Sequence, residues 1–362
     1  MVRFFKRVSS QAVVEIGIKT VNMVTLKDIA QKTGFSLSVV SRAMNPRPDQ
    51  KVAEKTRIVI EAACRELGYQ PNQAASLLAR GSNASIGLFL PRAYGEMVGQ
   101  LMTGLADIAN HHGFAYNAYF GNNDEDYLEF IRYSHRIQSA GIITYLPNYL
   151  NSNLPELLTQ LSGRGCQIVL LNCAGLKLAG VQTVCIDNYF GGREAARRLL
   201  ETGCRRFLST RTDPQTSWQL QERLRGFVDQ LALHGITAEV PVIHRQDDYR
   251  IADADFLREI AALARSRVPA GIFMPTDYEA ISLYDTLARE NLLDRIGDSL
   301  RIIGFDDLIV SNLIYPALTT LRQPFQALGE ISMARLLNAM VKADLPVDLN
   351  RLKPQLVIRA SA

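Results

Sequence analysis

The feature that most constrains this chain is an alternation of strand-like and helix-like stretches that begins at Ser85. Short apolar runs are separated by longer amphipathic stretches with the 3.6-residue period of a helix. We predict strands at 86–90, 115–120, 141–145, 167–171, 183–186, 206–210, 240–244, 271–274 and 301–305. We predict helices at 97–112, 154–164, 192–201, 219–234, 254–265 and 278–290. This alternation predicts parallel, doubly wound sheets with helices on both faces.

The number of these strands has a consequence for the architecture. About ten strands are more than one open sheet comfortably holds. We therefore expect two similar α/β lobes, with a ligand bound between them at the carboxyl ends of the strands.

The stretch from Val24 to Arg80 has a different pattern, with short helices separated by glycine and proline. Thr25 and Asp28 form a capping-box pattern that starts a first helix, and Gly34 ends it. A second helix follows at once, from Leu37 to about Met44. So short a turn between two helices predicts a helix-turn-helix.

A third helix is expected from about Ala53 to Leu67, with Gly68 as its stop. Its inward face is predicted to hold Val59, Ile60, Ala63 and Leu67. After Pro71 we expect one or two further helical turns and then a linker at 81–83. So short a helix is not stable by itself in water.

Charge is spread unevenly along the chain. The whole chain has a formal net charge of +4, but residues 1–80 hold 13 Lys or Arg against 6 Asp or Glu. A basic small end followed by a mildly acidic large part favours a polyanion partner for the small end. Chance clustering of charge is the alternative.

Several classes of function are disfavoured by what the sequence lacks. The five cysteines are scattered without a C-x-x-C pair, which argues against a disulfide framework or a zinc site and for a reducing, cytoplasmic compartment. No apolar run reaches transmembrane length. Catalytic and phosphate-binding motifs are missing too, so we expect no enzyme activity, cofactor or metal.

The first residues do not read as an export signal. Their start is basic, but Glu15 and Lys19 interrupt the apolar part. Residues 1–22 are either a disordered extension or the result of a translation start placed too early, because Met23 directly precedes VTLKDIA.

A family resemblance rests on several segments in a fixed order. VTLKDIAQKTGFSLSVVSRAMN is followed by LGYQPNQAASLLAR, and later by CIDNYFGGREAARRLLETG, IFMPTDYEAI and RIIGFDDL. Over residues 24–362 the chain resembles the lactose-repressor/galactose-repressor (LacI/GalR) family of bacterial transcription regulators. The resemblance implies a small all-α helix-turn-helix head and a two-lobed periplasmic-binding-protein-like core. It further implies a homodimeric repressor that binds a near-palindromic operator in double-stranded DNA under control of a small effector, expected to be a sugar.

The resemblance also divides the chain. It implies a DNA-binding head at 24–71, a hinge helix and linker at 72–84, and an effector-binding and dimerisation core at 85–362, after a disordered extension at 1–23. The alternative is a two-lobed sugar-binding protein without a DNA role. An enzyme on a similar core is disfavoured by the missing phosphate-binding loop.

The resemblance places the second helix of the head in the major groove. The implied DNA-binding residues are Thr25, Leu37, Ser38, Val39, Ser41, Arg42, Asn45, Tyr69, Asn72, Ala75 and Leu78. Leu78 matches a leucine that wedges between base pairs in the minor groove. Leu37 departs from the larger polar residue of many relatives, which leaves the operator sequence open. Leu37 and Val39 both have the alternative of packing in the core of the head.

The implied effector-binding residues lie in the large part of the chain. They are Arg223, Asp306, Tyr249, Asp277 and Phe325, with Asn148 and Asn188 as secondary candidates. A guanidinium and a carboxylate can grip paired hydroxyl groups, which suits a sugar. The alternatives are structural: an Arg–Asp ion pair across the lobes, and a phenylalanine of the core.

Overall fold

The computed structural model describes residues 24–44, 52–69, 83–92, 95–146, 153–173, 176–211, 218–241, 243, 251, 253–266 and 268–362. The chain divides into two compact units, Met1–Asn72 and Gln73–Ala362. This division lies one residue from the predicted start of the hinge. The predicted extension at 1–23 and most of the segment at 72–84 lie outside the described residues, so those boundaries stay predictions.

Three helices form the head, as the sequence predicts: α1 (Leu26–Thr33), α2 (Leu37–Met44) and α3 (Glu54–Leu67). The carboxylate of Asp28 accepts hydrogen bonds from the backbone N–H and the hydroxyl of Thr25, both at 2.7 Å. These bonds use donors that the start of a helix otherwise leaves unsatisfied. Gly34 and Gly68 end α1 and α3 in the left-handed conformation, with φ of 73° and 69°.

The head closes on a small core of side chains from all three helices. The buried members are Ile29, Val40, Ala43, Ile60, Ala63 and Cys64. The inward position predicted for Val59 is wrong, because its side chain is 49% exposed. Ile60, Ala63, Cys64 and Leu67 have the i, i+3, i+4, i+7 spacing of a single helical face, and Val59 lies about 100° away from it.

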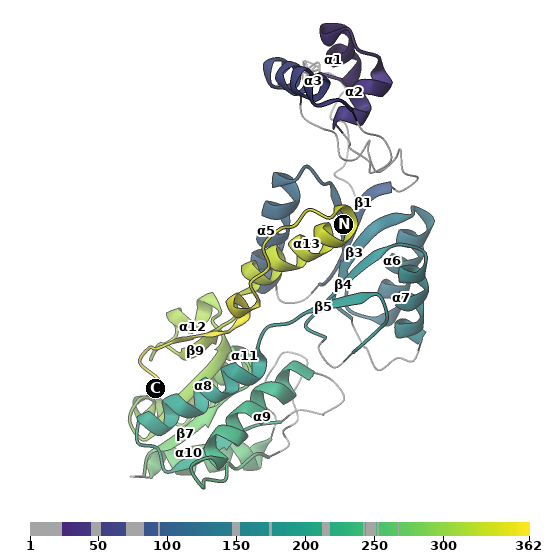
Figure 1. Cartoon of the computed structure of the whole chain (residues 1–362). Coiled ribbons are helices and arrows are strands. Elements are labelled where there is room, and N and C mark those ends of the chain that lie inside the picture. Colours follow the sequence, from purple (N-terminus) through teal and green to yellow (C-terminus); the bar gives the residue numbers. More distant parts are fainter. Residues whose placement is uncertain are drawn as a thin grey trace, which may run out of the picture. The chain divides into compact units, whose positions relative to one another are not determined.

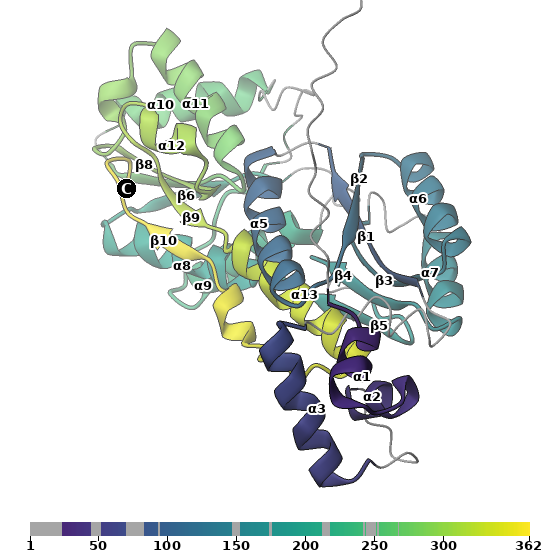
Figure 2. The same ribbon diagram turned by 90° about the horizontal axis from the view of Figure 1, so that it is seen from above.

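The first lobe of the core, the N-lobe, is a five-stranded parallel sheet with helices on both faces. Its strand order is β2-β1-β3-β4-β5. The strands are β1 (Asn83–Pro91), β2 (Tyr116–Gly121), β3 (Ser139–Thr144), β4 (Gln167–Leu171) and β5 (Val181–Val184). Figures 1 and 2 show α5 (Gly95–His111) and α13 (Phe325–Val341) on one face, and α6 (Asp124–Arg136) and α7 (Asn153–Gly163) on the other.

The second lobe, the C-lobe, repeats this architecture with the order β10-β9-β8-β7-β6. Its strands are β6 (Arg206–Ser209), β7 (Ala270–Phe273), β8 (Leu300–Asp306), β9 (Thr319–Arg322) and β10 (Gln355–Val357). One buried cluster packs α8 (Asn188–Glu201) and α9 (Trp218–Ala232) on the sheet, and another packs α10 (Ala254–Arg265) and α11 (Asp277–Arg289). The short α12 (Ile309–Leu313) and a 3-10 turn (Leu293–Arg295) complete it, whereas a second 3-10 turn (Leu349–Leu352) places Leu352 in the core cluster of the N-lobe.

These two lobes confirm the predicted doubly wound α/β class, with one refinement. Within the described residues of the two sheets, neighbouring strands pair in parallel except β10, which runs antiparallel to β9 at the edge of the C-lobe sheet. Strands β9 and β10 escaped prediction because they have only four and three residues and no apolar run.

The strand predicted at 240–244 is wrong over its described residues, 240, 241 and 243. The backbone there still follows the edge of β6, with Glu239 N–H donating to Phe207 O at 2.8 Å. Pro241 has no N–H to donate, which disfavours a regular ladder through this stretch.

Two glycines let α5 and α13 cross at close range. A Cβ added at Gly104 would overlap the backbone carbonyl of Gln326, and one at Gly329 would overlap that of Leu101. The last long helix of the chain therefore completes the core of the first lobe. This core cluster joins α13 residues such as Leu328 and Leu337 to strand residues of the N-lobe sheet.

This crossing gives a first prediction. Gly104→Ala should lower the free energy of unfolding by about 1–3 kcal/mol, because the added methyl group forces two backbones apart. Urea unfolding followed by circular dichroism measures it. The matched control is Gly99→Ala in the same helix, where an added Cβ meets nothing within 4 Å. That change should stabilise the chain by up to about 1 kcal/mol, and equal effects of the two substitutions would contradict the close crossing.

Candidate functional site

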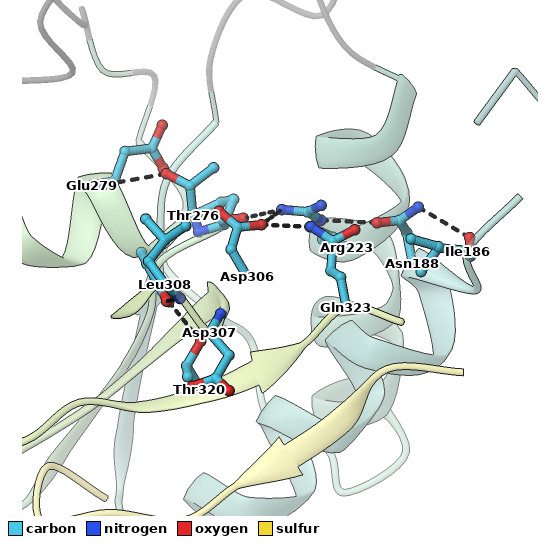
Figure 3. Close-up of polar contacts among 12 residues, drawn as sticks. Ile186, Asn188, Arg223, Thr276, Glu279, Asp306, Asp307, Leu308, Thr320 and Gln323 are labelled. Carbon is cyan, nitrogen blue, oxygen red and sulfur yellow. Dashed lines mark hydrogen bonds and ion pairs between the residues drawn. The ribbon is translucent and has the colours of Figure 1, made fainter. Parts of the chain in front are cut away.

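A cluster of buried polar side chains lies at the carboxyl ends of the C-lobe strands (Figure 3). Asp306 is the last residue of β8 and Gln323 follows β9, while Arg223 and Asn188 come from α9 and α8. None of the four is more than 8% exposed. The predicted residues Arg223 and Asp306 are thus brought together, at the edge of the sheet where doubly wound folds bind ligands.

Arg223 is held from several directions. Its Nη1 donates to Asp306 Oδ1 at 3.3 Å and to the carbonyl oxygen of Pro275 at 2.7 Å. Its Nε donates to Asn188 Oδ1 at 2.9 Å, and the guanidinium lies 3.8 Å from the centroid of the Phe305 ring. A buried cation is tolerated when it is paired and hydrogen-bonded in this way.

The ion pair forms within one lobe. Asp306 and Arg223 both belong to the C-lobe, so the alternative of an Arg–Asp pair across the lobes does not describe this structure. Arg223 instead links α9 to α8 and to the ends of β7 and β8.

Asp306 lies in a conformation that few non-glycine residues adopt. Its φ is 136°, and that of Asp307 is 60°. Strained backbone of this kind is concentrated at functional sites. Gln323 Nε2 donates to Asp306 Oδ1 at 2.5 Å. Burial raises the pKa of Asp306 to about 7, against the opposing effect of the Arg223 charge.

The structure places Asp277 against the segment that follows β8. It is fully buried, and its Oδ2 accepts hydrogen bonds from Ser311 Oγ at 2.6 Å and Leu308 N at 3.0 Å. Its Oδ1 accepts from Thr320 Oγ1 at 2.5 Å. Asp277 therefore anchors the backbone that carries Asp306, and its contact with an effector stays a prediction.

The other predicted effector residues differ in what the structure says of them. Phe325 is 7% exposed and belongs to the buried cluster of the N-lobe, at the start of α13. Its role in ligand binding stays a prediction. Tyr249 and Asn148 lie outside the described residues.

Gln323 is the member of the cluster that sequence reasoning missed. It could be placed beside Asp306 only once β9 is known to pair with β8, with Asp306 opposite Arg322. The available signal was a polar side chain directly after TTLR, a segment too short and too polar to read as a strand.

Helix α2 presents its predicted DNA-reading residues to different degrees. Ser38 and Arg42 are exposed and Leu37 is 44% exposed, whereas Ser41 is half-buried. Ser38 Oγ lies 3.0 Å from Ser36 Oγ, and Arg42 Nε donates to the carbonyl oxygen of Ser38 at 3.1 Å. The outward face of α2 thus offers a hydroxyl, a guanidinium and an apolar group for contact with base edges and phosphates.

The remaining residues predicted to bind DNA have mixed positions. Val39 and Tyr69 are half-buried and pack against the core of the head, as the alternative for Val39 proposes. Thr25 is exposed at the start of α1. Four further residues lie outside the described part of the chain: Asn45, Asn72, Ala75 and Leu78.

The raised pKa of Asp306 predicts a specific dependence of stability on pH. The folded chain retains this proton to a higher pH than the unfolded chain, so stability from this group declines as pH rises from about 4 to about 7. Asp306→Asn cannot ionise. The stability of the original chain relative to this variant should therefore fall by up to about 1.4 kcal/mol per pH unit in that window.

Urea unfolding at a series of pH values measures this difference. Asp255→Asn, which removes a carboxylate at an exposed position on α10, is the matched control for the loss of a carboxylate. Parallel pH profiles for the Asp306→Asn variant and the original chain would contradict the raised pKa.

Comparison with known proteins finds a matching family in each of the two units of this chain. The family described as "Bacterial regulatory proteins, lacI family" matches residues 25–72, and the periplasmic binding protein-like domain matches residues 196–362. The ribose operon repressor of Bacillus subtilis is 30% identical over 324 residues, covering 88% of this chain and 92% of that protein. The regulator GalR of Escherichia coli is 28% identical over 344 residues, covering 94% and 96%.

Solved structures show the same fold. A complex of the transcriptional regulator CelR with cellobiose has a TM-score of 0.64 at 24% identity, over 94% of this chain and all of that one. The lac repressor dimer bound to operator and an anti-inducer has a TM-score of 0.60 at 23% identity, over 94% and 99%.

No observation favours the alternative of a binding protein without a DNA role, and the relatives named above are regulators of transcription. None of the helices in the described ranges is long and apolar enough to cross a membrane. The head, the two-lobed core and the relatives agree: the chain belongs to the lacI family of bacterial regulatory proteins and is a DNA-binding regulator of transcription.

Proposed function

We propose that this regulator is a homodimeric repressor whose affinity for a near-palindromic operator is controlled by a sugar bound at the Arg223–Asp306 cluster. The observation that carries the proposal is the buried pair itself, with Gln323 on the same carboxylate oxygen. At the carboxyl ends of the C-lobe strands, a guanidinium, a carboxylate and an amide supply several directed hydrogen-bond donors and acceptors. Polyhydroxyl ligands require such groups.

The relatives support a sugar as the ligand class. Two relatives of known structure are complexes with cellobiose and with D-xylulofuranose, and another relative is a ribose operon repressor. Tyr249, Asp277 and Phe325 remain part of the proposed site. Asp277 would act by fixing the backbone of Asp306.

The proposed mechanism couples the core to the head. An effector that binds one lobe arrangement better than another shifts the population toward it, by no more than its differential affinity. That shift would decide whether the two hinge segments of the dimer can meet in the minor groove, where Leu78 is the proposed wedge. The two α2 helices would read half-sites in successive major grooves.

A thermal-shift screen of sugars on the full chain tests the ligand class, because a ligand that binds only the folded state stabilises it. Gel shifts with DNA from upstream of the protein's own gene, against random DNA at stated salt, test the operator. Equal affinity for the two DNAs would contradict the repressor proposal. A melting temperature that no sugar changes would contradict only the proposed class of effector.

Arg223→Ala should retain operator binding and lose the response to the sugar that the screen identifies. Fluorescence anisotropy of labelled operator, with and without that sugar, measures both. Removing the Arg223 side chain leaves Asp306 buried without its cation. Arg223→Lys is therefore tested together with Arg223→Ala, because lysine keeps the positive charge but lacks the planar, multi-donor guanidinium. Arg225→Ala, an exposed neighbour on α9, is the matched control. A normal response in both Arg223 variants would remove this residue from the site.

Two substitutions on α2 separate base reading from phosphate contact. Ser38→Ala should weaken binding to the operator by about 1–3 kcal/mol and leave random DNA unaffected, since a hydroxyl reads base edges. Arg42→Ala should weaken both and reduce the slope of log affinity against log salt by about 1. Salt titrations by anisotropy measure these effects, and equal losses on both DNAs for Ser38→Ala would contradict base reading.

A further inference from the structure

A hydrogen bond crosses from one lobe to the other next to the polar cluster. Gln219 Nε2, in the first turn of α9, donates to the backbone carbonyl oxygen of Asn172 at 2.9 Å. Asn172 directly follows β4 of the N-lobe, while α9 packs on the C-lobe sheet. The Gln219–Asn172 bond, called the cross-lobe bond below, therefore joins elements of two different sheets.

The N-lobe end of this bond is rigidly held. Asn172 has a left-handed φ of 53°, and its N–H donates to Val184 O at 2.9 Å. Its side-chain Oδ1 accepts from Ile186 N at 2.9 Å, and its Nδ2 donates to Tyr145 OH at 3.1 Å. The side-chain amide is thus committed within the N-lobe. The left-handed backbone fixes the direction of the carbonyl group that Gln219 meets.

The C-lobe end is equally fixed. Gln219 lies four residues, or about one helical turn, before Arg223 on the same side of α9. Arg223 ties this helix to Asn188, Pro275 and Asp306.

Helix α9 also has little freedom to slide on α8. A Cβ at Gly192 would overlap the carbonyl of Arg223, and one at Gly226 would overlap that of Tyr189. Such close backbone packing transmits displacement instead of absorbing it. A change in the position of Asn172 relative to Gln219 is therefore a change in the position of one lobe relative to the other.

We propose that Gln219 is a positioning residue, whose bond to the Asn172 carbonyl holds the Tyr145–Asn172 face of the N-lobe beside the Arg223–Asp306 face of the C-lobe. Both partners belong to the chain, so the bond needs no ligand to form. An effector that contacts both faces then finds them already together and does not have to supply that free energy itself. This last consequence rests on the proposed effector site, whereas the cross-lobe bond does not.

The length and chemistry of the side chain are both required. Alanine removes the donor, and glutamate keeps the length but places a carboxylate oxygen against a carbonyl oxygen. One net hydrogen bond changes a two-state equilibrium by about 2- to 12-fold. Loss of the bond should therefore change the population of lobe arrangements measurably without unfolding either lobe.

The test measures the distance between the lobes directly in the full-length protein. Spin labels are attached through an introduced ketone amino acid, which avoids the native cysteines, at Glu125 on α6 and Arg258 on α10. Both positions are exposed. Pulsed electron paramagnetic resonance gives the distance distribution for the parent chain, Gln219→Ala, Gln219→Glu and the control Gln221→Ala. Gln221 is exposed on the same helix, so Gln221→Ala makes the same glutamine-to-alanine change at a different position on α9.

In dimers that pair one labelled chain with one unlabelled chain, so that only distances within a chain are measured, we expect one dominant distance for the parent and the control. Both Gln219 variants should give a broader distribution with an added distance. Superimposable distributions for the parent and both variants would overturn the proposal. If Gln219→Ala failed to fold, as judged by circular dichroism, the isosteric Gln219→Glu would decide. This readout uses neither DNA nor sugar, so a failed effector screen leaves its result standing.

Discussion

The buried ion pair between Arg223 and Asp306 is the interaction on which the geometry of the C-lobe depends. One guanidinium joins its own helix, α9, to α8 and to the ends of two strands, and it stacks on Phe305. Removing one partner of such a pair leaves a buried charge without compensation. This costs far more free energy of folding than the intact pair contributes. The groups that position α9 are therefore the same groups that we propose to bind a polar ligand, so a structural role and the proposed binding role coincide at this edge of the sheet.

Rigid contact between helices is what turns this local chemistry into a relation between lobes. The glycines at the α8–α9 and α5–α13 crossings allow backbones to touch, so the two helices of each pair are packed backbone against backbone. The cross-lobe bond of Gln219 then joins two stiff parts at a point one turn from the ion pair. Allosteric response needs such bistable, well-packed elements, because a soft interior would absorb a small displacement.

Much of the fold could be read from local pattern. The ranges of α10 and β4 match their predictions residue for residue, and Gly34 and Gly68 end their helices as expected. Local sequence pattern did not predict the features that depend on pairing between distant parts of the chain. Strand β9 has too few apolar residues to be noticed, so Gln323 could not be placed, and the role of Asp277 as a backbone anchor depends on contacts more than thirty residues away. Arg223 and Asp306 were found through family motifs, since nothing in their spacing indicates that they meet.

The position of α13 has a consequence for how the chain is made. This helix supplies much of the buried face of the N-lobe, yet its residues follow nearly the whole of the C-lobe in sequence. During synthesis the N-lobe sheet must wait for α13 with the part of one apolar face that α5 does not cover left exposed, and contacts of such long sequence separation form slowly. The lobe whose strands are translated first can thus be completed only after the C-lobe strands β6 to β9 have been translated, and until then part of its apolar face is open to aggregation.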